Sequence, residues 1–263
     1  MTNRMVFRAI VATAILVLDN PVLADAPAKS ECSGQRIAEE VYAGNFDAAL
    51  TMTDRCVEFS KSELARAQAE EATNHSQIIN VVGLAELKLR AYLVAKPEIL
   101  ALKGAFLQAE SAIADAEASI RQQPHLQMDW SSMGFPLVVV RAFLLEKKGD
   151  LKGAVEAYQK ILKDSKARGW MSNSSITEGR AALAALAQGD DTPALRLSKE
   201  TLAEDPGANV ALAKVLEKRG DKNAAKECYT TALKLMSDGI KSSNWNLPLF
   251  FAEHKSAQDG AAK

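Results

Sequence analysis

A glycine followed by Asp or Asn, with an alanine five positions after the glycine, recurs along this chain and constrains its fold more than any other feature. The four glycines are Gly44, Gly149, Gly189 and Gly220. Glycine adopts the left-handed conformation that ends a helix, and the Asp or Asn after it accepts hydrogen bonds from the first free amides of the next helix. Thirteen residues after each glycine stands a Leu or Val, so an apolar stripe follows each turn at helical period. The spacing predicts helical hairpins that turn at these glycines.

The last of these hairpins, from about Asn209 to Ser237, shows the pattern most fully. The residues that carry it are Ala213, Leu216, Gly220, Asp221, Ala225, Tyr229 and Ala232. They resemble the tetratricopeptide repeat (TPR), a helix-turn-helix unit of about 34 residues. The resemblance implies an all-α superhelix, a TPR-like solenoid of about five helical hairpins with a C-terminal capping helix. It also implies a scaffold that binds a protein or peptide partner, because stacked hairpins build an extended binding surface.

The amino terminus carries the pattern of a secretory signal. Arg4 and Arg8 precede an apolar run over residues 9–18, and Val22-Leu23-Ala24 suits signal peptidase. We expect cleavage after Ala24 rather than Ala26, because Pro27 would otherwise stand directly after the cut. An apolar run of about ten residues is too short to span a bilayer. We therefore expect a periplasmic or secreted protein with no stable membrane anchor.

Three segments follow from these patterns. Residues 1–24 are the predicted signal peptide, and residues 25–255 form the predicted TPR-like domain. Residues 256–263 are small and polar, which predicts a disordered tail. Trp245 and the apolar residues after it predict a short helix that caps the last repeat, with docking into another molecule as the alternative.

The cysteines predict a disulfide. Cys32 lies twelve residues before Gly44 and Cys56 twelve residues after it, so both sit at the same height in an antiparallel hairpin. An oxidising compartment favours a bond between them, and the alternative is a pair of buried reduced thiols. Cys228 is left over, and we expect it to be buried rather than reactive.

The region between Ser60 and Pro124 offers two candidate turns. Pro97 interrupts a helical pattern, and Gly104-Ala105-Phe106 with Ala109 looks like a fifth glycine turn. We favour Pro97 as the turn, because proline ends helices. The number of units in this region stays open at this point. Further along, we expect one continuous helix over residues 192–203 after the turn at Gly189.

Two tryptophans are candidate binding residues. Trp130 and Trp170 each stand 19 residues before a repeat glycine, which suggests an inserted loop shared by two adjacent units. If both side chains are exposed along one edge of the solenoid, they would bind a peptide or a glycan. The interpretation that we favour is a structural wedge between hairpins. The alternative function, a protein that binds a small ligand or a glycan, depends on these loops.

The family resemblance also points to a binding face. In the family, ligands lie along the concave face, which the first helix of each hairpin lines. The matching positions are Val139, Phe143, Glu146, Gly179, Leu183, Leu186, Val210, Lys214 and Glu217. They are apolar or mixed in sign, so an apolar or helical segment fits them better than an acidic peptide end. The other interpretation is that this face packs against a further helix of the same chain.

Charge and motif content argue against other classes. Without Arg4, Arg8 and Asp19 of the signal, 32 basic and 33 acidic residues become 30 and 32, a net charge near −2. Such a balance provides no field that attracts nucleic acid. The three histidines, His75, His125 and His254, are far apart in sequence and form no metal-ligand pair at helical spacing. We expect no cofactor, no metal and no enzymatic activity, and an active site assembled from dispersed residues ranks third.

Intact mass spectrometry of the exported chain tests the signal and the disulfide together. We expect the mass to lack the first 24 residues, and alkylation of the denatured chain without reductant to modify one thiol, that of Cys228. Reduction should then make two more thiols available. A chain that retains residues 1–24, or one with three thiols alkylated before reduction, would contradict the corresponding prediction.

Overall fold

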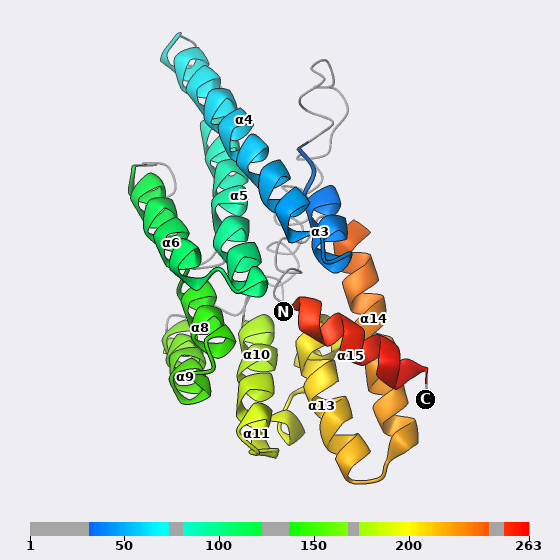
Figure 1. Cartoon of the computed structure of the whole chain (residues 1–263). Helices are drawn as coiled ribbons and strands as arrows, with labels where there is room; N and C mark the ends of the chain where they lie inside the picture. Colours follow the sequence, from blue (N-terminus) through cyan, green and yellow to red (C-terminus); the bar gives the residue numbers. More distant parts are fainter. Residues whose placement is uncertain (1–31, 74–80, 123–136, 168–173, 242–249, 263) are drawn as a thin grey trace, which may run out of the picture.

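The computed structural model describes residues 32–73, 81–122, 137–167, 174–241 and 250–262, and within these ranges it contains helices and no strand (Figure 1). This confirms the predicted all-α fold. The helices pair in chain order as α3 (Gly34–Tyr42) with α4 (Phe46–Thr73), α5 (Val81–Lys103) with α6 (Phe106–Arg121), α8 (Leu137–Lys147) with α9 (Leu151–Ala167), α10 (Ser174–Ala187) with α11 (Thr192–Leu195) and α12 (Lys199–Glu204), and α13 (Pro206–Lys218) with α14 (Lys222–Lys241). A last helix, α15 (Phe251–Ala261), follows them. Among the described helices, none is both long and apolar enough to cross a bilayer.

Every hairpin turn is built on a glycine with positive φ. The five are Gly44, Gly104, Gly149, Gly189 and Gly220, with φ between 80° and 89°. At each turn the amide after the glycine donates to the carbonyl five residues earlier, at 2.9–3.0 Å. This bond satisfies one of the free carbonyls at the end of the first helix. The repeated glycine is therefore required by the backbone, as the sequence predicts.

The second hairpin turns at Gly104, so the prediction of a turn at Pro97 is wrong. Pro97 lies buried inside α5, which continues to Lys103. A proline removes one hydrogen bond from a helix of 23 residues, and packing of α5 against α4, α6 and α8 compensates for that loss. Gly104 has φ +82° and ends the helix without an Asp or Asn after it.

The expected continuous helix over residues 192–203 is also wrong. The segment breaks after α11, and Ser198 takes an extended conformation with φ −74° and ψ 160°. Its hydroxyl accepts a hydrogen bond from the Thr201 amide at 3.1 Å, so Ser198 starts a new helix, α12, as an N-cap. The break leaves Leu195 39% exposed.

The carboxyl-terminal residues form a packed helix where disorder is predicted. Helix α15 covers residues 251–261, so the prediction for residues 256–263 is wrong over 256–261. Ala257 is fully buried, and a Cβ atom at Gly260 would come within 2.2 Å of the Tyr229 ring. Ala257 and Gly260 lead the sequence to predict a disordered tail. In the structure their small size allows α15 to approach α14 closely.

Helix α15 also joins the two ends of the stack. It packs on α13 and α14, and both α14 and α15 contact α3 (Figure 1). The Phe251 ring lies edge-on to Phe46 at 5.1 Å between centroids, and His254 meets Tyr42 at 4.8 Å. The first hairpin thus touches the last one, so the solenoid closes on itself.

The cysteines of the first hairpin lie together. Cys56 is buried and Cys32 half-buried, and both are free thiols in the structure. Burial, followed by a hydrogen bond and the charge of Cys32, raises the pKa of Cys56 above its usual range. The Tyr92 hydroxyl donates to the Cys32 carbonyl at 3.1 Å and fixes this segment on α5. The structure places the two sulfurs in contact, and the disulfide itself stays a prediction.

A substitution at Gly104 tests the position of the second turn. A Cβ atom at Gly104 meets nothing within 4 Å, so the cost of Gly104→Ala comes from the backbone alone. We expect the free energy of unfolding to fall by about 1–2 kcal/mol in urea titrations, because alanine disfavours positive φ. Gly104→Asn should cost less, since asparagine tolerates this conformation. Equal stabilities of wild type, alanine and asparagine variants would show that the chain does not turn here.

Candidate binding groove

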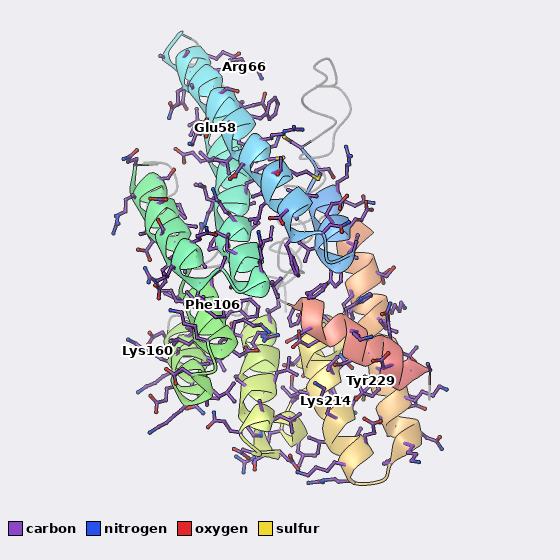
Figure 2. All side chains as sticks on the ribbon, viewed as in Figure 1. Glu58, Arg66, Phe106, Lys160, Lys214 and Tyr229 are labelled. Carbon is purple, nitrogen blue, oxygen red and sulfur yellow. The ribbon has the colours of Figure 1, made fainter. Side chains whose placement is uncertain are left out.

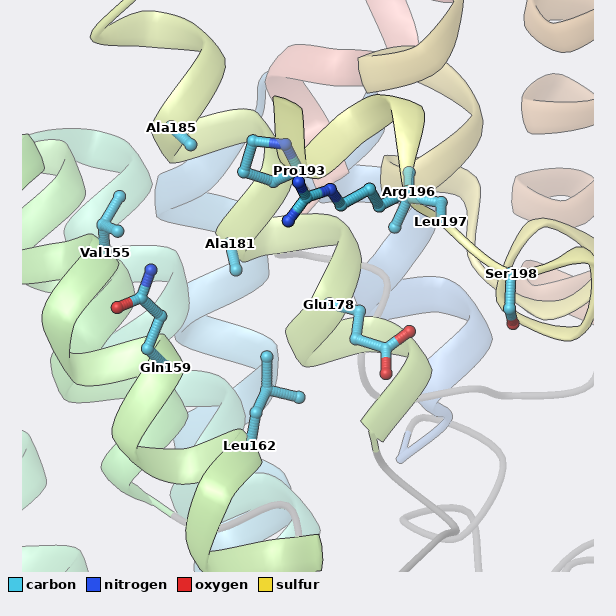
Figure 3. Close-up of a pocket in the computed structure, with 10 residues that line it drawn as sticks. All are labelled: Val155, Gln159, Leu162, Glu178, Ala181, Ala185, Pro193, Arg196, Leu197 and Ser198. Atoms are coloured by element: carbon cyan, nitrogen blue, oxygen red, sulfur yellow. The ribbon is translucent and has the colours of Figure 1, made fainter. Parts of the chain in front are cut away.

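A hollow of about 300 Å³ opens between α9, α10 and the segment that joins α11 to α12 (Figure 3). Its apolar lining is formed by Val155, Leu162, Ala181, Ala185 and Leu197. Ala181 and Ala185 are small, so the surface of α10 is low there, and the chain beside it is not helical between α11 and α12.

Four polar side chains surround the apolar floor. Gln159 and Arg196 are exposed, and Figure 3 shows the Arg196 guanidinium reaching across α10 beside Pro193. Glu178 is turned to α12, where the Thr201 hydroxyl donates to its carboxylate at 2.5 Å. Ser198 is already engaged as the N-cap of α12. Among the described residues Arg196 has no ion-pair partner, so it is the charge that this groove offers to a ligand.

A second hollow, of about 350 Å³, lies between α4, α5 and α6 at the same position of the repeat. In both hollows the lining includes residues six and ten after one turn glycine, and eight and four before the next one. The chemistry differs, because Lys96 replaces Ala181 and forms an ion pair with Asp54 at 2.7 Å. Ser111 takes the place of Arg196. The groove between neighbouring second helices is thus a recurring feature whose side chains vary.

The interior of the closed stack holds a buried charge. Arg180 on α10 has no exposed side-chain surface and pairs with Glu146 of α8 and with Glu253 of α15, the latter at 3.1 Å. Its guanidinium lies over the rings of Phe143 and Phe250, at 5.0 and 5.8 Å from their centroids. Burial alone would lower the pKa of Arg180, but the two carboxylates outweigh it and raise the pKa well above its usual value. The cluster ties three helices together.

The pair of Glu146 and Tyr158 has a counterpart in the last hairpin. The Tyr158 hydroxyl donates to Glu146 at 3.2 Å, and the Tyr229 hydroxyl donates to Glu217 at 3.1 Å. In each case the Glu stands three residues before the turn glycine and the Tyr nine residues after it. These bonds brace the two helices of a hairpin, so the carboxylates serve the fold.

Asp205 is a buried acid at the start of α13. It caps the helix by accepting a hydrogen bond from the Gly207 amide at 2.7 Å. A Cβ atom at Gly179 would stand 2.0 Å from its Oδ2, so α10 needs a glycine there. Burial raises the pKa of Asp205 to about 8, although backbone amides and the Arg180 charge act in the opposite direction. We therefore expect Asp205 to hold its proton into the neutral pH range.

The structure tests the placement of the predicted binding residues. Val139, Phe143, Leu183 and Val210 are buried in apolar clusters of the chain itself, and they offer no surface in this conformation. Leu186 and Lys214 are half-buried. Phe250, the residue before α15, packs in the same apolar cluster as Val139 and Phe143, so the chain itself covers this part of the predicted binding face. Trp130, Trp170 and Trp245 lie outside the described residues.

Sequence reasoning missed Arg196, Arg180, Glu253 and Asp205. A charged residue on a helix is ordinarily solvated, and no local pattern separates Arg180 from the exposed cations around it. The two hollows have a signal in the sequence, because their lining recurs at fixed offsets from the turn glycines. Among the described residues, no cluster of three or more His, Cys, Asp or Glu could hold a metal ion.

Comparison with known proteins identifies one repeat. Residues 206–237, which cover α13 and most of α14, match the tetratricopeptide repeat family. No curated protein matches the chain. Among solved structures, the crystal structure of BtubC (BKLC) from P. vanneervenii is similar, with 14% identity, a TM-score of 0.47, and coverage of 80% of this chain and 89% of that one. The chain is thus TPR-like. Repeats of this family mediate contacts between proteins and are typically not enzymatic.

Asp205 gives the stability of the fold a pH dependence. Its pKa of about 8 in the folded state exceeds the value of about 3.9 in an unfolded chain. The folded state therefore holds the proton more tightly, and this contribution to stability is full below about pH 4 and lost as the pH rises to 8. We expect wild type to lose up to a few kcal/mol, in order of magnitude, between pH 5 and 8 relative to Asp205→Asn, which keeps a cap without titrating.

Urea unfolding at both pH values measures this difference. Asp221→Asn, at the exposed cap of α14, controls for the loss of one acidic residue. Identical pH profiles of wild type and Asp205→Asn would show that Asp205 is ionised in the folded protein.

Proposed function

We propose that this protein is a non-enzymatic scaffold of the cell envelope that binds a partner polypeptide. The observation that carries the proposal is a tetratricopeptide repeat at the end of a stack of helical hairpins. Such stacks present side chains from successive units along one surface, which suits an extended segment of another protein.

The groove between α9, α10 and α11–α12 is the surface that we assign to this contact. The apolar positions of the concave face are already covered by the chain, whereas this groove is open and has both an apolar floor and a polar rim. Binding sites of this kind combine apolar contact area with a few polar groups that fix the orientation. The partner would thus dock between the second helices of neighbouring hairpins.

The envelope location rests on the signal pattern of residues 1–24 and on the cysteines. In an oxidising compartment the contacting thiols of Cys32 and Cys56 would be oxidised to a disulfide. A disulfide of an exchange partner would take up the two electrons and two protons and become a dithiol. The bond would fix the start of the first hairpin on α4. Since α3 contacts α14 and α15, it would also support the closure of the stack.

Photocrosslinking in the source organism tests the function and its location on the surface. A photoreactive phenylalanine analogue at Gln159, inside the groove, should give an adduct with one polypeptide in the envelope fraction. The matched control is Arg66, exposed at the far end of α4 (Figure 2). The same polypeptide captured equally at both positions, or no adduct with any polypeptide at Gln159, would contradict the proposal. Adducts with glycan alone would favour the glycan-binding alternative.

A further inference from the structure

We propose that the groove between α9, α10 and α11–α12 recognises a partner segment in which a carboxylate stands next to an apolar side chain, with Arg196 pairing with the carboxylate. The inference rests on the proposed function and specifies the chemistry of the partner. It goes beyond the family match, which covers residues 206–237 and none of the residues of this groove.

The apolar floor of the groove suits an apolar side chain of the ligand. Val155 and Leu162 on α9 face Ala181 and Ala185 on α10 across the hollow (Figure 3). A hollow of about 300 Å³ has room for one large apolar side chain with part of its backbone. Filling it would remove apolar surface from water, which favours binding.

Arg196 determines the charge of the ligand group that the groove would bind. Its guanidinium reaches over the floor of the groove, and no carboxylate among the described residues forms an ion pair with it. A planar guanidinium binds a carboxylate through two parallel hydrogen bonds. An anion next to the apolar side chain would meet this cation without displacing an existing partner.

The other charges around the groove are already engaged. Glu178 accepts the hydroxyl of Thr201, and Asp191 is held by Lys218 at 3.0 Å. Asp190 accepts hydrogen bonds from Thr192, which, with a smaller effect from the Arg196 charge, lower its pKa. A ligand carboxylate therefore finds its free donor at Arg196, and the engaged acids disfavour an approach elsewhere.

The equivalent groove between α4, α5 and α6 differs in its chemistry. There Lys96 lies on the floor and is paired with Asp54, and Ser111 stands where Arg196 does. That groove holds the ion pair of Lys96 and Asp54, whereas the first groove has Ala181 and a cation with no ion-pair partner in the described part of the chain. The same backbone position thus carries the proposed specificity in one unit and lacks it in another.

Two small probes separate the contribution of the apolar side chain to binding from that of the carboxylate. N-acetyl-phenylalanine carries the apolar side chain and a carboxylate, whereas N-acetyl-phenylalaninamide lacks the charge. We expect the first to shift the NMR signals of Leu195–Ser198 and the Arg196 side chain saturably in the mature chain, and the second to bind at least tenfold more weakly. Arg196→Glu should abolish the preference for the acid. Arg219→Glu, an exposed arginine on another turn, makes the same charge change and should leave the preference intact.

Equal affinity of the two probes, no saturable shift, or an unchanged preference in Arg196→Glu would overturn the inference. These outcomes are distinct from a failure of the proposed function. An adduct at Gln159 together with indiscriminate probes would keep the scaffold and reject the carboxylate. Absence of an adduct at Gln159 would reject the scaffold at this groove whatever the probes show.

Discussion

The closed arrangement of the hairpins depends on Arg180. A guanidinium with no exposed surface is costly unless its charge is paired, and Glu146 and Glu253 supply that pairing from α8 and α15. Because Glu253 belongs to the last helix, satisfying Arg180 requires α15 to lie inside the stack. The rings of Phe143 and Phe250 also lie within cation–π distance of the guanidinium. One buried charge therefore couples the middle of the chain to its end.

The ion pairs of Arg180 determine where α15 packs more than they increase the free energy of unfolding. Buried ion pairs recover at best a modest net energy, because desolvation of the three groups offsets their attraction. Removing one partner would leave a buried charge unpaired, so competing placements of α15 are penalised heavily. An apolar helix would slide or rotate on α13 at low cost, and the pair of Arg180 and Glu253 fixes one position. The glycine contacts at Gly207 and Gly260 fix the same position by shape.

Local signals decided which parts of the fold were predictable. The glycine turns, the helix pairs and the final repeat follow from residues within one hairpin, because positive φ and helix capping are local requirements. The wrong prediction of a turn at Pro97 also came from a local signal. A proline reads as a turn locally, but packing of α5 against three helices keeps the helix continuous. The prediction of a disordered tail is wrong because nothing in the local sequence indicates that Gly260 packs against Tyr229 of α14.

The candidate site was harder to predict, because its lining comes from three elements of two neighbouring hairpins. The equivalent position between α4, α5 and α6 is also hollow although α6 is continuous there, so the hollow follows from how neighbouring hairpins pack. In the groove beside α10, Ser198 interrupts the second helix by capping α12, and Leu197 and Ser198 join the lining. Evolution of a binding groove on such a scaffold needs no new backbone. Substituting the residues at fixed offsets from the turn glycine is sufficient, as the contrast between Arg196 and Ser111 illustrates.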